Sequence, residues 1–114
     1  MYLSHPIDTD IISLMELRLL RAFVTLAEEI HFGRAAERLG IAQPPFSLQI
    51  QALEASLGAR LFERSRRRVA LTEAGNALLP EARATLAQAE RARQTVQRVA
   101  RGEMGRLDFG FTGS

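Results

Sequence analysis

Residues 32–58 have the sequence FGRAAERLGIAQPPFSLQIQALEASLG, which predicts two short helices separated by a tight turn. The first helix would place four apolar residues on one face: Phe32, Ala35, Ala36 and Leu39. Gly40 follows, and a glycine just past a helix end can take the left-handed conformation that closes the last turn. The second helix, residues 43–57, opens with two prolines, which a first turn tolerates because its amides lack intrahelical partners. Its inward face would be Phe46, Ile50, Leu53 and Leu57, and Gly58 ends it.

Two short helices joined in this way can place the second where its outer face enters the major groove of DNA. The small side chain of Ala36 would let the helices approach closely, and Leu39, Ile41 and Phe46 would cover the crossing. An ordinary helical hairpin within a bundle would explain the same residues equally well. From this stretch alone both interpretations stay open.

The segment after Gly58 predicts a small β-hairpin with a basic tip. Short apolar runs at 61–63 and 69–71 flank the polar stretch RSRRR, and residues 60–68 contain five arginines against the single acid Glu63. A solvated surface is the usual explanation of a charge run, but unpaired like charges repel unless something anionic meets them. Arginine also suits phosphates and base edges better than lysine does. A helix-turn-helix followed by a basic wing therefore favours DNA binding over a plain bundle.

Upstream of this region, a helical period sets in at Met15. Its predicted inward face comprises Leu17, Leu20, Phe23, Val24 and Ala27. Residues 1–14 show no sustained period, and we expect them to form a disordered extension.

Downstream, Thr72 and Glu73 are suited to cap and begin a long helix that ends at Gly102 and Gly105. Its apolar residues follow the spacing of a coiled-coil seam, which predicts a dimer interface at Leu79, Ala82, Leu86, Ala89 and Val96. Arg93 interrupts this seam, and Pro80 should bend or loosen the first two turns. Residues 106–111 alternate like the start of a strand that has nothing to pair with, so we expect a piece of a longer protein. The predicted fold class is mainly α: a winged helix-turn-helix of three helices and a two-stranded wing, followed by a long dimerisation helix.

Composition excludes several other classes of function. The 114 residues carry a net charge of +2, all fifteen basic residues are arginine, and there is no cysteine for a disulfide, a thiol nucleophile or a cysteine zinc site. No apolar run suggests a membrane span or a signal peptide, so we expect a cytoplasmic protein. No phosphate loop or carboxylate pair suggests an enzyme, and His31 is expected to be a surface or helix-entry residue. The remaining rival is a protein-interaction module that uses the long helix, with the basic hairpin as ordinary surface.

From Phe23 to Leu79 the chain resembles the DNA-binding domain of LysR-type transcriptional regulators. The matching stretches are RAAERL (34–39), AQPPFS (42–47), QALE (51–54), Leu57-Gly58, LFER (61–64) and LTEAG (71–75). Another winged-helix family fits the long helix and the following strand less well.

The resemblance implies a bacterial, cytoplasmic regulator that binds double-stranded DNA at an interrupted palindrome. It would act as a homodimer through its linker helix, with a tetramer possible in the full-length protein. No cofactor is expected in this chain, whereas a small-molecule effector is expected for the full-length protein. The implied organisation is an extension (1–14), a winged helix-turn-helix (15–72), a linker helix (73–104) and the start of an effector-binding domain (105–114). Thr112 and Ser114 match the start of that last domain and would border its ligand cleft.

Carried over by position, the resemblance makes residues 43–57 the recognition helix. Its residues expected to contact DNA are Gln43, Pro44, Pro45, Ser47 and Gln51. The wing would add Arg64 and the tip residues Arg66, Arg67 and Arg68 at the backbone and the adjacent minor groove. Arg34 is an expected phosphate contact, with a solvated surface charge as the alternative. Thr72 belongs to the same surface, although its cap role alone would explain it.

Two departures from the family pattern affect the expected sequence preference. Leu48 stands where the family commonly has a basic residue, so one DNA contact is lost or replaced by an apolar contact, such as one with a thymine methyl group. Ala42 stands where the family often has a serine or threonine cap, which forfeits about 1 kcal/mol of capping.

Overall fold

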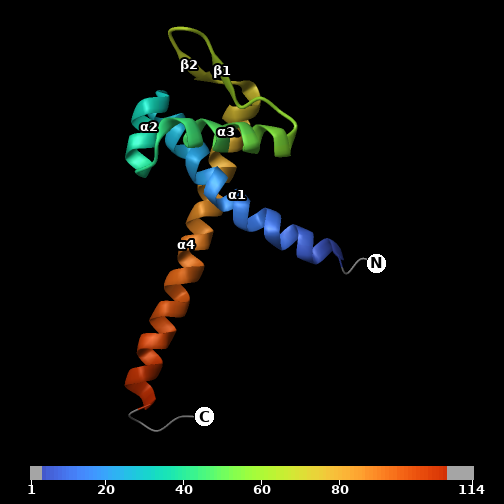
Figure 1. Cartoon of the computed structure of the whole chain (residues 1–114). Helices are drawn as coiled ribbons and strands as arrows, with labels where there is room; N and C mark the ends of the chain where they lie inside the picture. Colours follow the sequence, from blue (N-terminus) through green and yellow to red (C-terminus); the bar gives the residue numbers. More distant parts are fainter. Residues whose placement is uncertain (1–3, 108–114) are drawn as a thin grey trace. The chain divides into compact units, whose positions relative to one another are not determined.

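The computed structural model describes the backbone of residues 4–107 and the side chains of residues 17–102 (Figure 1). Its elements, in chain order, are helices α1 (Ser4–Glu29), α2 (Phe32–Leu39) and α3 (Gln43–Leu57), strands β1 (Phe62–Arg64) and β2 (Val69–Leu71), and helix α4 (Glu73–Leu107). The chain divides into two units, residues 1–83 and residues 84–114, and α4 belongs to both. The predicted class, mainly helical with one two-stranded wing, is confirmed.

The hydrophobic core of the first unit lies where α1 packs against α2 and α3. The core residues are Leu19, Ala22, Phe23, Leu26, Ala35, Ala36, Phe46, Ile50, Leu53, Leu61, Phe62 and Ala82. The rings of Phe23 and Phe62 lie 5.5 Å apart, so β1 is joined to the same core as the helices. Because α1 also meets β1, its buried arc differs from the predicted one. Leu19, Ala22 and Leu26 are buried, whereas the predicted Leu20, Val24 and Ala27 are only half-buried.

The turn between α2 and α3 forms as the sequence predicts. Gly40 has φ 72°, and it donates its N–H to the carbonyl of Glu37 while Ile41 donates to that of Ala36. These bonds satisfy carbonyls that the end of α2 would otherwise leave unpaired. Gly58 ends α3 in the same left-handed conformation, with φ 69°. Ala42 caps α3 with no side-chain hydrogen bond, as expected for alanine at this position.

Strands β1 and β2 pair antiparallel, with Glu63 opposite Ala70 at the centre. Figure 1 shows this hairpin projecting beyond α2 and α3. Strand β1 begins at Phe62, one residue later than predicted. The N–H of Leu61 donates to Glu54 of α3, while its carbonyl accepts from the N–H of Thr72, just past β2. We call residues 62–71 the wing and residues 65–68 its tip.

Helix α4 begins at Glu73 after a Thr72 cap, as predicted, with Pro80 inside it. It continues through Gly102 and Gly105 to Leu107, so these glycines do not end it and residues 106 and 107 are helical, not extended. A glycine in an exposed helix costs about 1 kcal/mol, which a long, alanine-rich helix can absorb. The rest of the predicted strand, together with Thr112 and Ser114, lies outside the described residues.

Helix α1 begins at Ser4, so the backbone over residues 4–14 is helical where the sequence predicts a disordered extension. Pro6 lies in the first turn, where its missing N–H removes no intrahelical bond. Once a helix has formed downstream, each further residue adds one hydrogen bond without a new nucleation cost. Within residues 4–107, no helix combines the length and the apolar character needed to cross a membrane.

Candidate nucleic-acid interface

Helix α3 turns one face into the core and leaves the other open. Phe46, Ile50 and Leu53 are buried as predicted, whereas Leu57, predicted with them, is 46% exposed because it lies in the last turn, beyond the core. Five of the residues predicted to face DNA are exposed: Gln43, Pro44, Pro45, Leu48 and Gln51. Ser47, predicted with them, is half-buried. Its position is closer to the core side of the helix, so of the predicted set it is the least accessible.

The tip of the wing is a tight turn that carries three arginines. The N–H of Ser65 donates to the carbonyl of Arg68 over 2.9 Å, and the N–H of Arg68 donates to the Ser65 hydroxyl over 3.3 Å. Within the described part of the chain, no carboxylate pairs with the guanidinium groups of Arg66, Arg67 and Arg68, which are exposed. The tip therefore concentrates positive charge that no carboxylate among residues 17–102 neutralises.

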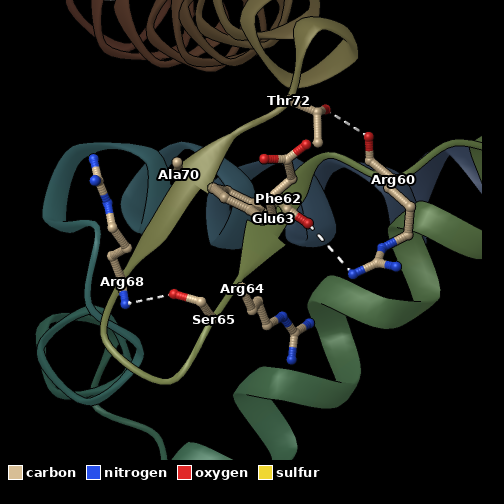
Figure 2. A pocket seen from close by; sticks show the side chains of 8 residues that line it. All are labelled: Arg60, Phe62, Glu63, Arg64, Ser65, Arg68, Ala70 and Thr72. Atoms are coloured by element: carbon tan, nitrogen blue, oxygen red, sulfur yellow. Dashed lines mark hydrogen bonds between the residues drawn. The ribbon is translucent and has the colours of Figure 1, made fainter.

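Arg64 lies on β1, below the tip. Its guanidinium carbon lies 4.6 Å from the centroid of the Phe32 ring, a cation–π distance, and Phe32 in turn packs edge-on against Phe46 of α3. Figure 2 shows the Arg64 and Arg68 side chains extending away from one another. Both line a hollow of about 720 Å³ against the hairpin, together with Arg60, Ser65 and Thr72. The Glu63 carboxylate lines the hollow as well, so its charged lining is three guanidinium groups and one carboxylate. The guanidinium groups are the part of this lining that suits phosphate oxygens.

Glu54 holds the base of the wing to α3, a role that sequence reasoning missed. Its carboxylate is buried, with the residue 8% exposed, and its Oε2 accepts hydrogen bonds from the N–H groups of Leu61 (2.9 Å) and Phe62 (3.2 Å). The Arg60 Nε lies 3.9 Å from the same oxygen, too far for a hydrogen bond. The sequence did contain a signal for this role: Glu54 directly follows Leu53 and is four residues after Ile50, both on the predicted inward face of the helix.

Thr72 uses its hydroxyl within the protein. The hydroxyl donates to the carbonyl of Arg60 over 2.6 Å and accepts from the N–H of Gly75 over 3.0 Å (Figure 2). A hydroxyl has one proton, so Thr72 has none left to donate to a phosphate. The cap role that the sequence offered as an alternative is the one that the geometry supports.

Arg34 belongs to a small ion-pair network formed by residues of α1, α2 and α4. Its Nε lies 3.4 Å from Glu29 Oε1, and its Nη2 donates to the Glu29 carbonyl over 3.1 Å. Arg38 pairs with both Glu28 and Glu29, and Arg83 of α4 pairs with Glu28. Hydrogen bonds from Arg38 and then Arg83 lower the pKa of Glu28, and one from Arg38 is the main cause that lowers the pKa of Glu29. Arg34 remains largely exposed and can turn toward an anion.

His31 is the N-cap of α2, in line with the expected helix-entry role. Its Nδ1 accepts a hydrogen bond from the N–H of Arg34 over 3.0 Å. Across the part of the chain that the structure describes, no cluster of three or more His, Asp and Glu side chains could hold a metal ion.

The seam residues predicted on α4 differ in their surroundings. Ala82 is buried in the core of the first unit, and Leu79 packs against that core. Both side chains therefore contribute to the core of their own chain, independently of any dimer. Leu86 and Ala89 are half-buried, and Val96 is 67% exposed.

The two short helices around a left-handed glycine turn, followed by a hairpin with an arginine tip, define a winged helix-turn-helix. The sequence model described as "Bacterial regulatory helix-turn-helix protein, lysR family" matches residues 17–76. The chain belongs to this family.

Known proteins of the same kind are closely similar to the chain. The HTH-type transcriptional regulator YnfL of Escherichia coli (strain K12) is 53% identical over 100 residues, which cover 88% of this chain and 34% of YnfL. The structure of a CbnR_DBD–DNA complex matches with a TM-score of 0.70 and 44% identity, over 74% of this chain and 97% of that one. A BenM_DBD complex with catB site 1 DNA matches with a TM-score of 0.71 and 43% identity, over 74% and 93%. The chain thus spans about a third of the length of YnfL.

Proposed function

We propose that this chain binds double-stranded DNA sequence-specifically, as the DNA-binding part of a bacterial transcription regulator that acts in the cytoplasm. The observation that carries the proposal is the wing tip, where Arg66, Arg67 and Arg68 have no acidic partner among the described residues. The proposal is further supported by the two relatives of the same fold, CbnR and BenM, whose DNA-binding domains have been solved on DNA.

In the proposed complex, α3 enters the major groove and the wing lies along the backbone. Gln43 and Gln51 donate to and accept from base edges, and Ser47 donates to a phosphate as far as its half-buried position allows. Pro44 and Pro45 make apolar contacts at the mouth of the groove. Arg34, Arg64 and the tip arginines contact phosphates, where their charge releases counterions. Thr72 acts indirectly, because it holds the base of the wing.

We further propose that two copies pair through α4 and so present two recognition helices to the half-sites of an interrupted palindrome. Since Ala82 and Leu79 serve the core of their own chain, this pairing rests on Leu86, Ala89 and Val96. The division into a winged domain (15–72), a linker helix (73–104) and an effector-binding part beyond it remains part of the proposal. So do a small-molecule effector and a tetramer for a longer protein.

A salt titration of binding to duplex DNA tests the proposal. The wild-type chain is compared with a variant carrying Arg66→Ala, Arg67→Ala and Arg68→Ala. A matched control removes the same charge from exposed sites of α4, with Arg91→Ala, Arg98→Ala and Arg101→Ala. Each phosphate contact contributes about 0.9 to the slope of log K against log salt, so the wing variant should lose about two to three units of slope. The control should lose less than one.

The competing function is a protein-interaction module with the wing as ordinary surface. If the wild type, the wing variant and the control all bind DNA equally weakly, with no steep slope, the proposal fails and that interpretation replaces it. If the wing and control variants lose the same slope, the chain is a non-specific polycation and the wing has no special role.

A further inference from the structure

The exposed face of the recognition helix carries no charge at all. Among the fifteen residues of α3, only Glu54 is charged, and it is buried against the N–H groups of Leu61 and Phe62. Everything that α3 presents to the outside is therefore an amide, a hydroxyl or an apolar group. Any positive charge in the interface comes from other elements.

Leu48 is the largest apolar group on this face. It is 63% exposed, which is high for a leucine in the second turn of a helix whose other side forms the core. Helical spacing places it beside Pro44, Gln51 and Ala52, all exposed, at separations of three or four residues. Together these residues make an uncharged stripe, and Leu48 stands at its centre.

Cationic groups border α3 on more than one element. Arg18 of α1 lines a hollow together with Leu48 and Ala52. Arg64 of the wing lies over Phe32, whose ring contacts Phe46 of α3. An apolar protein partner would not need Arg18 beside Leu48, whereas a DNA groove offers phosphates at its rims and methyl groups on its floor.

We propose that Leu48 is a specificity-determining residue that selects a thymine by contact with its 5-methyl group in the major groove. The inference rests on the proposed function, because it assumes that α3 lies in that groove. A leucine cannot bond the acceptors of guanine as an arginine would, so this position discriminates through methyl burial. Each methyl-sized group removed from water strengthens binding about fourfold.

The test begins with selection of sites from a random duplex pool by the wild-type chain. Each thymine of the selected site is then replaced singly by deoxyuridine, which removes the methyl group and keeps the base pair. One replacement should weaken wild-type binding about fourfold. The same replacement should leave the affinity of Leu48→Ala unchanged, which is the coupling that a double-mutant cycle measures.

Leu57→Ala is the matched control. Leu57 is the other exposed leucine of α3, and nine residues from Leu48 it lies on the opposite side of the helix axis. This variant should keep the wild-type sensitivity to deoxyuridine. A Leu48→Arg variant should lose the sensitivity and raise the salt slope by about 0.9. Because Leu48 is exposed, the thermal midpoints of both Leu48 variants should match that of the wild type.

Failure of the inference is distinguishable from failure of the proposed function. If the wild type enriches no sequence and shows no salt-dependent binding, DNA binding itself is refuted. If a site is selected but every deoxyuridine is neutral, the chain binds DNA and Leu48 does not select a thymine. Equal sensitivity in wild type and Leu48→Ala also overturns the inference, because another residue then contacts the methyl group.

Discussion

One oxygen of the Glu54 carboxylate accepts the N–H of Leu61 over 2.9 Å and also that of Phe62, so α3 and the first strand of the wing share a single buried acceptor. The last turns of α3 and the first residues of the hairpin are thereby held together without any side chain from the tip. Together with the Phe23–Phe62 ring contact and the hydrogen bonds of Thr72, this acid fixes how the wing lies against α3.

Removal of that acceptor should destabilise the fold. In Glu54→Ala two buried N–H groups lose their partner, and each unsatisfied group costs about 1–3 kcal/mol. We expect the free energy of unfolding, measured by urea denaturation, to fall by about 2–4 kcal/mol. Glu37→Ala, which removes an exposed acid of α2, should change it by less than about 0.5 kcal/mol. Equal effects of the two substitutions would show that Glu54 does not hold the wing.

Gly75 permits a close approach between α4 and the base of the wing. A Cβ at this position would lie 2.3 Å from the carbonyl oxygen of Leu61 and 2.7 Å from Leu71 Cδ2. Gly75→Ala should therefore lower the free energy of unfolding by about 1–3 kcal/mol or more, because backbone must move. Gly102→Ala is the control in the same helix, since nothing lies within 4 Å of its added Cβ. It should raise helicity by circular dichroism and stabilise α4 by up to about 1 kcal/mol. A loss in both variants would contradict the steric explanation.

The ion pairs of Glu28 and Glu29 predict an acid-dependent loss of stability. Hydrogen bonds from Arg38 lower the pKa of both carboxyls, so their stabilising contribution is present above the ordinary glutamate pKa and is lost as pH falls through the lowered values. In Arg38→Gln the pKa of each should rise toward its ordinary value. Between about pH 5 and pH 3 the urea midpoint should then fall less steeply in this variant than in the wild type.

Titration of the glutamate carboxyl carbons by NMR measures those pKa values directly. The control is Arg91→Gln, which replaces an exposed arginine of α4 and should leave the pKa values of Glu28 and Glu29 unchanged. If Arg38→Gln also leaves both pKa values unchanged, the ion pairs do not persist in solution.

Pairing through α4 predicts a concentration-dependent dimer. Val96 is exposed and can meet a second copy, so Val96→Asp should shift sedimentation at micromolar concentration from dimer to monomer without unfolding the first unit. Gln97→Asp adds the same charge one residue away, off the seam, and should leave the dimer intact. A wild-type chain that sediments as a monomer would remove the dimer from the proposal for these residues.

Local signals in the sequence were sufficient to predict the helix-turn-helix. Gly40 and Gly58 end their helices with positive φ, and Pro44 and Pro45 occupy a first turn, because these preferences are properties of single residues and their neighbours. The exposure of Gln43, Leu48 and Gln51 followed from the same helical period. Their contacts with DNA stay predictions.

Features that depend on tertiary contact could not be predicted in the same way. An acid on a helix is normally solvated, so nothing in the sequence marks Glu54 as buried until Leu61 and Phe62 are placed beside it. Ala82 fits a coiled-coil seam and a monomer core equally well by spacing. The ends of α1 and α4 were misplaced because a weak helical segment such as 4–14, or a glycine such as Gly102, is decided by small free-energy differences.

The wing is attached to the rest of the domain at its base, and this has a consequence for how the sequence can evolve. Glu54 and Thr72 hold the start and the end of the hairpin, whereas residues 65–68 are bonded only to one another across the turn. Substitutions at Arg66, Arg67 and Arg68, whose exposed side chains make no hydrogen bond within residues 17–102, can therefore accumulate without endangering folding. Substitutions in the tip can therefore alter which partner the wing binds, while Glu54 and Thr72 at its base remain unchanged.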